Sequence, residues 1–478
     1  MTSIWWIRDD LRLHDNAALT AAADAGPVIA LHIDESVPGA RRPGGATRWW
    51  LHQSLSALAS RLREHGIPLV LADGDPRQVL PALVAESAAG AVHWQRRYHA
   101  PHRAVDAEVK TALRENGIDA ESHPGHLLHE PWTIRTGQGS DYRVFTPFAR
   151  ACEEAPTPQR PRGVPDGLEG PAAGVRAAGH EVRTWLRAED FAHRLAERGW
   201  EPSHPDWAGG LRDTWTPGED GARSRLDELS DVLSRYDSEQ DRPDREGTSR
   251  LSPHLRFGEI SVREVWHRSL GRGPHADVRR TGGQGRGVQG KGAQAFRRQL
   301  LWRDFAWHRL FHVPTLATNN IRSRFDTLDW REDSQELRAW QHGRTGIPLV
   351  DAGMRELWET GFMHNRVRLV VGSFLTKNLR QHWRRGEEWF WDTLVDADEA
   401  SNPFNWQWVA GSGDDAAPYF RIFNPERQRE RFDPDCSYVR RWVPELSGFE
   451  EERLEPIVDL AASRRDALAA YEATADPD

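Results

Sequence analysis

Acidic, amide, aromatic and basic side chains crowd residues 396–425, DADEASNPFNWQWVAGSGDDAAPYFRIFNP. A core helix would repeat apolar residues every three or four positions, and a half-buried strand would alternate them. Because this segment does neither, we expect its polar groups to meet a ligand. Its aromatic rings offer flat surfaces beside those groups.

Asp396 and Asp398 lie two residues apart, so in an extended segment both carboxylates share one face. Such a pair could serve acid–base chemistry or bind a metal ion. No further carboxylates or histidines follow at the spacing of a known metal-binding loop. The sequence therefore predicts no metal site.

A second polar segment lies at residues 247–252, GTSRLS. Thr248 and Ser249 precede an apolar helical pattern, where their hydroxyls could cap free amides and where the positive helix end attracts phosphate. A capped helix start would explain these residues, and a phosphate site is the alternative.

A third segment combines a glycine stop with donors at a fresh helix start, in TGFMHNRVR at residues 360–368. His364, Asn365 and Arg366 would all lie near one helix N-terminus. A solvated helix end and a ligand site both remain open. Residues 299–305, QLLWRDF, instead follow a helical pattern in which Leu300 and Phe305 are expected in the core.

The elements that must position these residues divide the chain. Strand-length apolar runs alternate with helical patterns through the first 130 residues, which predicts a doubly wound parallel sheet covered on both faces. We expect this α/β domain over residues 1–130, an interdomain linker over 131–200, and a large all-α domain over 201–478. The linker contains the Pro- and Gly-rich residues 151–180. The predicted strands are residues 3–8, 28–33, 69–72 and 91–94.

Composition narrows the class of protein. The 478 residues carry a net charge of −9, which disfavours nucleic-acid binding by overall charge but permits a local basic patch. Cys152 and Cys436 are too few for a disulfide framework. No apolar run is long enough for a membrane span, and the N-terminus is not a secretory signal. We expect a cytoplasmic monomer. Tryptophan is unusually frequent, with 22 residues.

Together these motifs resemble the DNA photolyase/cryptochrome family, and are closest to its class I cyclobutane pyrimidine dimer photolyases. TSRLS at 248–252, twelve residues beyond Tyr236, is similar to the family's TSxLS run, and WRDF at 302–305 to its WRxF segment. WIRDDLRLHDN at 6–16 resembles the family's opening motif. The likeness spans nearly the whole chain and implies FAD as cofactor.

The resemblance assigns roles in flavin binding. Asp398 would accept a hydrogen bond from the isoalloxazine imide, while Arg368 would pair with Asp396. Asn402 would face flavin N5, where a polar group can favour the reduced or radical ring. The full set implied to bind FAD is Tyr236, Thr248, Ser249, Arg250, Leu251, Ser252, Arg303, Arg368, Asp396, Asp398 and Asn402.

The resemblance also implies roles in catalysis and substrate binding. Trp406, Trp383 and Trp330 match the family's electron-transfer chain from the flavin to the surface. Trp302 would stack on the lesion. The residues implied to contact damaged DNA are Gln299, Trp302, Asn365, Arg366, Leu369 and Trp408, and the catalytic set adds Asn402 and Gln299 to the three tryptophans.

The implied activity is light-driven repair of cyclobutane pyrimidine dimers in UV-damaged DNA, by electron transfer from excited FADH⁻. A folate or a deazaflavin could serve as a second, antenna chromophore. Gln240, Gln299 and Leu369 depart from dimer-repairing members, which usually carry Arg, Glu and Met there. These departures leave a cryptochrome photoreceptor and a (6-4) photoproduct photolyase as alternatives.

Overall fold

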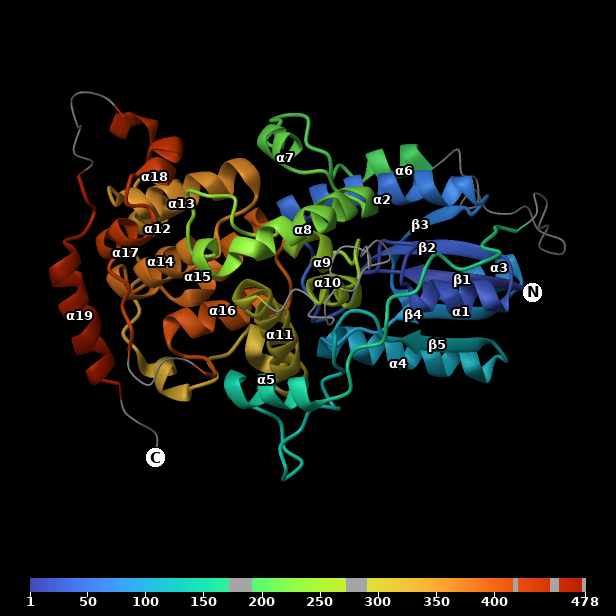
Figure 1. Ribbon diagram of the computed structural model, residues 1–478. Coiled ribbons are helices and arrows are strands. Elements are labelled where there is room, and N and C mark those ends of the chain that lie inside the picture. The colour runs from blue at the N-terminus through green and yellow to red at the C-terminus, as the bar shows by residue number, and fades with distance from the viewer. Residues whose placement is uncertain (172–190, 272–289, 416–419, 448–454, 475–478) are drawn as a thin grey trace, which may run out of the picture.

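The structure, a computed structural model, describes residues 1–171, 191–271, 290–415, 420–447 and 455–474. Residues 172–190 of the expected linker lie outside this described part. Figure 1 shows an α/β part that contains the N-terminus beside a helical part that contains the C-terminus.

The α/β part is built on a five-stranded sheet in which every strand pair is parallel. Its strand order is β3-β2-β1-β4-β5. The bounds are β1 (Thr2–Ile7), β2 (Val28–Glu35), β3 (Leu69–Gly74), β4 (Ala89–Gln95) and β5 (Asp119–His123). The four expected strands are present, and β5 is an additional strand at one edge.

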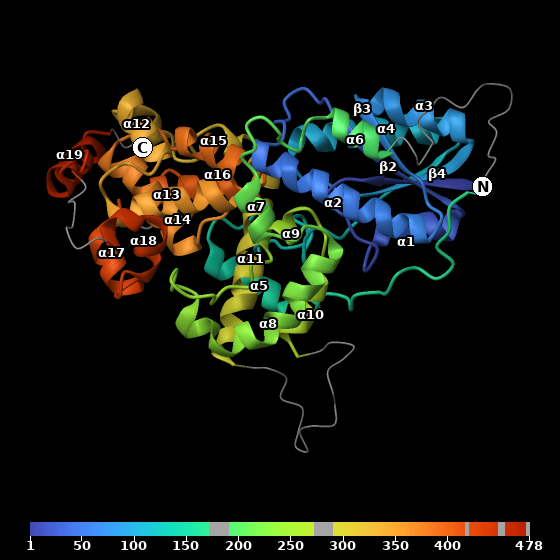
Figure 2. The same cartoon turned by 90° about the horizontal axis from the view of Figure 1, so that it is seen from above.

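Helices cover both faces of this sheet, as Figures 1 and 2 show. In β1, Trp5 and Ile7 pack toward α1 (Ala17–Ala25) and α2 (Gly45–Glu64), while Ile4 and Trp6 face the opposite side. On that side lie α3 (Pro76–Ser87) and α4 (Ala100–Glu115). Burial of both faces explains why β1 lacks a polar alternation. The predicted doubly wound α/β fold is confirmed.

The remaining described chain is helical, which confirms the predicted all-α part. None of the described helices is both long and apolar enough to cross a membrane. The α-helices are α5 (Phe145–Glu154), α6 (Phe191–Glu197), α7 (Gly209–Thr214), α8 (Glu219–Glu239), α9 (Ser252–Arg256), α10 (Val262–Ser269), α11 (Lys291–His312), α12 (Ser334–Gln341), α13 (Pro348–Thr360), α14 (Asn365–Ser373), α15 (Trp383–Thr393), α16 (Ser401–Ala410), α17 (Pro425–Phe432), α18 (Ser437–Trp442) and α19 (Leu460–Glu472). Shorter turns are η3 (Pro314–Ala317), η4 (Ser323–Thr327), the π-helical η5 (Phe374–Asn378) and η6 (Pro444–Ser447).

The turn at residues 8–16, which follows β1, ties the two parts together. Buried Asp15 accepts hydrogen bonds from the Ser261 hydroxyl at 2.5 Å and from the Arg263 guanidinium at 2.8 and 3.1 Å. Arg12 donates to the carbonyl oxygen of Gly258 at 2.8 Å. Charge-assisted hydrogen bonds of this kind are stronger than neutral ones. They fix the sheet against the helices around α9 and α10.

Candidate functional site

A cavity of about 270 Å³ lies among α8, α9, α11, α14, α15 and α16, and we call it the central cavity. Its walls combine apolar rings such as Phe296 and Phe390 with a set of charged and amide side chains. The residues predicted from sequence that line it are Tyr236, Ser249, Leu251, Ser252, Gln299, Arg303, Asn365, Arg368, Leu369, Asp396, Asp398, Asn402 and Trp406.

One wall of the central cavity carries an ion pair and a hydroxyl. Arg368 on α14 donates from Nη2 to both carboxylate oxygens of Asp396, at 3.1 and 2.9 Å. Ser252, the first residue of α9, donates to the same carboxylate at 2.7 Å. The guanidinium is thereby held at the cavity wall beside hydroxyl groups, which suits contact with a phosphate.

A second wall places a buried carboxylate next to Arg303. Oδ1 of Asp398 accepts the backbone N–H groups of Ala400, at 2.8 Å, and Ser401, so it caps the start of α16. Burial raises the pKa of Asp398, and the nearby Arg303 guanidinium opposes that rise. Oδ2 accepts no hydrogen bond from the described residues, so it is the oxygen available to a ligand N–H group.

Asn402 presents an acceptor to the cavity. Its amide nitrogen donates to the backbone oxygen of Glu387 at 3.1 Å and to the Glu387 carboxylate at 2.8 Å. That carboxylate also accepts from Arg41 at 2.9 and 2.8 Å. Burial raises the pKa of Glu387, and Arg41 opposes the rise. With the nitrogen engaged, Oδ1 is the Asn402 atom left to meet a ligand donor.

A second hollow, of about 320 Å³, adjoins the central cavity and is called the stacking hollow here. Trp302, Trp408 and Phe404 line it. One face of Trp302 stacks on Phe145 with ring centroids 3.6 Å apart, and the Trp408 indole N–H donates to the carbonyl oxygen of Asp415 at 3.0 Å. The two spaces share Gln299, Arg303, Asn365, Leu369, Ser401 and Asn405.

The three tryptophans predicted to carry electrons differ in burial. Trp406 lines the central cavity, and Trp383 is fully buried in the same hydrophobic cluster. Trp330 is half-buried and lines a surface hollow. The His382 ring lies between Trp330 and Trp383, with centroid distances of 5.0 and 5.6 Å. The residues thus run from the cavity toward solvent.

Three predicted ligand residues line neither the central cavity nor the stacking hollow. Thr248 does not line it, and Arg250 packs its guanidinium over Phe362, 5.2 Å from the ring centroid. Arg366 pairs with Asp241 at 2.7 Å. The structure therefore brings the other predicted flavin-binding residues together around the central cavity, whereas Thr248 and Arg250 do not line it.

The two predicted helix starts have different outcomes. The start after Gly247 is wrong, because α9 begins only at Ser252 and its N-cap residue, Leu251, has no side-chain acceptor. The start at 365 is confirmed: α14 begins at Asn365, and the His364 imidazole accepts the backbone N–H of Arg366 at 3.2 Å.

Sequence reasoning missed Glu387 and Arg256. Arg256 pairs with Asp9 at 2.6 Å and donates to the carbonyl oxygen of Ala397 at 2.8 Å. Burial lowers the pKa of Arg256, but Asp9 and neighbouring carboxylates more than offset it, so the pKa is raised. No local pattern could reveal this residue, because its partner Asp9 lies 247 positions away.

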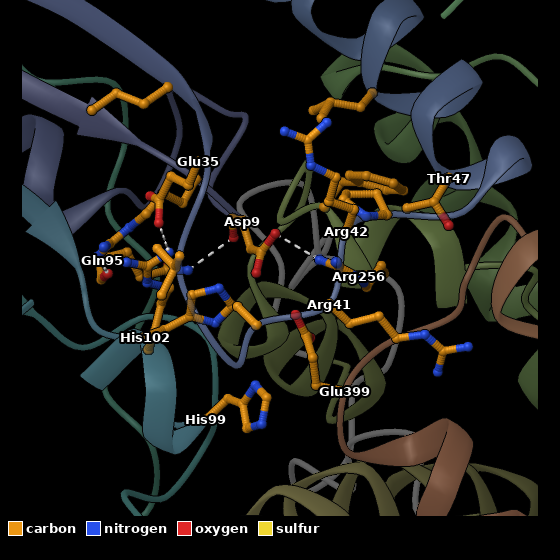
Figure 3. Close-up of a pocket in the computed structure, with 18 of the residues that line it drawn as sticks. Asp9, Glu35, Arg41, Arg42, Thr47, Gln95, His99, His102, Arg256 and Glu399 are labelled. Carbon is orange, nitrogen blue, oxygen red and sulfur yellow. Dashed lines mark hydrogen bonds and ion pairs between the residues drawn. The ribbon is translucent and has the colours of Figure 1, made fainter. Parts of the chain in front are cut away.

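Arg256 also borders a third space, the sheet-end cavity, of about 220 Å³ at the carboxyl ends of β1, β2 and β4 (Figure 3). Figure 3 shows Arg256 and Asp9 side by side within it. Arg97 pairs with Glu35 at 2.7 Å on its wall. Carboxyl ends of parallel strands, at a point where strand order changes direction, are a common ligand site in doubly wound folds.

Comparison with known proteins gives the family of this chain. Residues 3–166 match the family model described as DNA photolyase, and residues 296–473 match the FAD binding domain of DNA photolyase. The deoxyribodipyrimidine photo-lyase of Agrobacterium fabrum is 44% identical, over 98% of this chain and 97% of that protein. Cryptochrome-1 of Arabidopsis thaliana is 35% identical, over 93% of this chain and 63% of that protein.

The fold agrees with solved structures. A bacterial class III photolyase from Agrobacterium tumefaciens matches with a TM-score of 0.88 and 43% identity, over 99% of this chain and 97% of that one. The central cavity fits FAD chemically, because it offers a guanidinium and hydroxyls for a diphosphate, an acceptor at Asn402 and a buried carboxylate at Asp398. FAD is the cofactor of this domain, and the chain belongs to the DNA photolyase/cryptochrome family.

Proposed function

We propose that this protein repairs cyclobutane pyrimidine dimers in UV-damaged DNA, driven by light. One observation carries the proposal: the stacking hollow opens onto the central cavity through shared residues, among them Gln299, Asn365 and Leu369. Gln299 and Asn365 are exposed, so this shared wall faces solvent. A pyrimidine dimer flipped out of the DNA duplex could then lie against the flavin, as base-flipping enzymes require.

The chain's own residues would hold and orient both the FAD and the pyrimidine dimer. Bound FAD, in its reduced and excited form, supplies the electron that opens the dimer. Arg368 and Ser252 would contact its diphosphate, and Oδ1 of Asn402 would accept a hydrogen bond from a ring N–H group. Trp302, whose rear face is fixed by Phe145, would stack on the dimer.

Gln299 would orient the dimer carbonyls through its amide N–H₂ group. An amide can donate a hydrogen bond but cannot supply a proton. Gln299 thus supports lesion binding and makes dimer splitting slower than a carboxyl group would. The relatives support dimer repair at the level of the family. The similar structure is described as class III, so we propose class III in place of class I.

We further propose that the sheet-end cavity holds the second chromophore, a folate or a deazaflavin. A photolyase from Sulfolobus tokodaii, 26% identical with a TM-score of 0.76, is described as holding two FAD molecules and implying a novel light-harvesting cofactor. In this chain the sheet-end and central cavities share Arg256. Such adjacency would allow excitation energy to pass from one chromophore to the other.

The test is blue-light repair of an oligonucleotide with one defined cyclobutane thymine dimer, using chemically reduced, FAD-loaded protein. Restored thymines in the wild type, with weaker dimer binding in Trp302→Ala, are the expected result. Trp207→Ala, an exposed tryptophan outside both cavities, is the matched control and should bind and repair normally.

Absence of repair by protein with bound, photoreducible FAD would overturn dimer repair. The same assay with a (6-4) photoproduct would then test the second photolyase activity. By resemblance, (6-4) photolyases often carry a Gln at the position of Gln299, which favours this activity. They also use two histidines near the HNR segment, and here only His364 is present while Arg368 occupies the second position, which disfavours it. Failure of both assays would favour a cryptochrome photoreceptor, for which the departures at Gln240, Gln299 and Leu369 argue.

A further inference from the structure

Two imidazoles and a carboxylate meet on one face of the sheet, at the pair of strands farthest from β3. In the register of β4 and β5, His93 lies opposite Glu121, and His123 follows two residues later on the same face. One ligand atom from each of the three residues lies within 4.8 Å of the other two. Within the described residues this is the one group of three or more potential metal ligands with that geometry.

The imidazole spacing is close to what a metal ion requires. Nδ1 of His93 lies 3.1 Å from Nε2 of His123. Two imidazole nitrogens bound tetrahedrally to zinc, each at about 2.0–2.1 Å, would be about 3.3 Å apart. An opening of roughly 0.2 Å would therefore convert the present hydrogen-bonded pair into a pair of ligands.

The exposure of the three residues also suits a cation. His93 is buried and His123 is half-buried, so both imidazoles are held by the surrounding sheet. Glu121 is exposed and gives the ion a path from solvent.

We propose that His93, Glu121 and His123 bind a divalent transition-metal ion of the zinc type. Two imidazole ligands and one carboxylate match such an ion, whereas Mg²⁺ and Ca²⁺ prefer oxygen ligands throughout. Three protein ligands leave a fourth position for water. No sequence motif indicates this site, because β4 and β5 supply its members from separate segments.

One feature of His93 limits the affinity. Its Nε2 atom is buried and has no hydrogen-bond partner among the described residues. Coordination through Nδ1 would place the ring proton on this unpartnered nitrogen, at a cost of roughly 10- to 100-fold in affinity. We therefore expect a dissociation constant for Zn²⁺ in the micromolar range.

A metal ion bound at this site would make the β5 edge of the sheet more rigid. His123 ends β5, and its carbonyl oxygen accepts the backbone N–H of Arg96 at 2.8 Å. Three residues later, the carbonyl oxygen of His126 accepts from Arg303 at 2.7 Å, at the wall of the central cavity. A metal-bound His123 would thus anchor the segment that reaches Arg303. The expected signature is slower amide hydrogen exchange in β5 when Zn²⁺ is present.

The experiment is Zn²⁺ titration of untagged, FAD-loaded protein by calorimetry, with bound metal measured by equilibrium dialysis against a known Zn²⁺ concentration. The wild type should bind one Zn²⁺ per chain with a micromolar dissociation constant. Glu121→Gln, at an exposed position that tolerates substitution, and His123→Ala should each weaken binding by more than about 100-fold, since loss of an outer-shell partner alone costs about 10- to 100-fold. The flavin spectrum reports folding of each variant.

His193→Ala is the matched control, because His193 also faces a carboxylate, Glu197, on an exposed helix surface. It should bind Zn²⁺ like the wild type. X-ray absorption at the zinc edge should show two imidazoles and light-atom ligands at about 2.0–2.1 Å. Binding that survives both Glu121→Gln and His123→Ala, or that is absent in the wild type at millimolar Zn²⁺, overturns the proposal.

Discussion

At the scale of single residues, Asn402 is the side chain that we propose would tune the chemical state of bound flavin. Its nitrogen is held by Glu387, and Glu387 is held by Arg41 from the segment between β2 and α2. An acceptor fixed in this way stabilises a ring nitrogen that carries a proton and disfavours one that does not. We therefore propose that this side chain biases bound flavin toward its reduced or radical form.

Asn402→Ala should change which flavin redox state accumulates under light. Loss of one hydrogen bond costs about 1 kcal/mol, which corresponds to roughly 40 mV for a one-electron couple. Absorption spectra during illumination and a redox titration measure the effect. Asn116→Ala, at an exposed position that lines neither cavity and whose amide donates to the Ala112 carbonyl oxygen, is the control. An unchanged spectrum in Asn402→Ala would remove this role.

At the scale of elements, α15 and α16 form a tightly packed pair beside the flavin site. A Cβ atom added at Gly386 on α15 would lie 2.1 Å from the Trp406 ring and 2.6 Å from Leu375. Glycine is thus the residue that allows α15 to approach Trp406 this closely.

Gly386→Ala should push the Trp406 ring toward the central cavity, weaken FAD binding, and lower the free energy of unfolding by about 1–3 kcal/mol. FAD fluorescence titration and urea unfolding provide the two measurements. Gly209→Ala on α7, where no atom lies within 4 Å of the added Cβ, should leave both quantities nearly unchanged. Equal behaviour of the two variants would show that the packing at Gly386 is relaxed easily.

The tryptophans of the proposed electron path come from two helices and a connecting segment. Trp406 belongs to α16, Trp383 begins α15, and Trp330 lies between η4 and α12. Trp330→Phe should slow flavin photoreduction while FAD binding stays normal, because phenylalanine is harder to oxidise than tryptophan. Flash-induced absorption changes measure the rate. Trp266→Phe, half-buried beside Arg297, is the control. Wild-type photoreduction in Trp330→Phe would exclude Trp330 from the path.

Elements with strong periodicity were predictable, and polar ones were not. The apolar run at residues 3–8 predicted β1 to within one residue at each end, and the helical pattern at residues 299–305 lies inside α11. β5, with the sequence DAESH, has neither an apolar run nor alternation. It forms because its backbone pairs with β4 and its single fully buried side chain, Ala120, faces the core.

The residues of the candidate site also differ in how far the sequence could predict them. Residues in continuous motifs, such as Asp396 to Asn402, could be assigned together because the motif itself is local. Glu387 and Arg256 could not, since each acquires its role from a partner supplied by another element. The chain also contains more tryptophans than an electron path needs. The motif selected Trp406, and the structure adds that this residue both packs in a hydrophobic cluster and lines the central cavity.

For the whole molecule, Glu219 at the start of α8 joins parts that are distant in sequence. Its carboxylate accepts the backbone N–H of Leu13 at 2.9 Å, pairs with His14 at 2.6 Å and with Arg61 of α2 at 2.8 Å. Burial by itself would raise the pKa of Glu219, but the His14 hydrogen bond, the Leu13 amide and Arg61 together lower it to about 2.

A lowered pKa means that the ionised carboxylate stabilises the fold above the unfolded-state value near 4.5, and that this contribution is lost as pH falls toward 2. Glu219→Gln should reduce the free energy of unfolding by about 3 kcal/mol at pH 7, with the difference from the wild type shrinking below pH 4. Urea unfolding at several pH values measures it. Glu228→Gln, which removes an exposed pair with Arg225, should cost almost nothing. A pH-independent difference for Glu219→Gln would contradict the assignment.

The polarity of β5 has one more consequence. An open sheet offers unpaired N–H and C=O groups along its outermost strands, and these can recruit a strand from another molecule. Asp119 and Glu121 are exposed on β5, and negative charges that must be desolvated or brought together make such recruitment unfavourable. At the opposite margin, Arg198 donates to the carbonyl oxygen of Ala72 in β3, which leaves that acceptor already satisfied. Features of both edge strands, β5 and β3, thus disfavour pairing with a strand of another molecule.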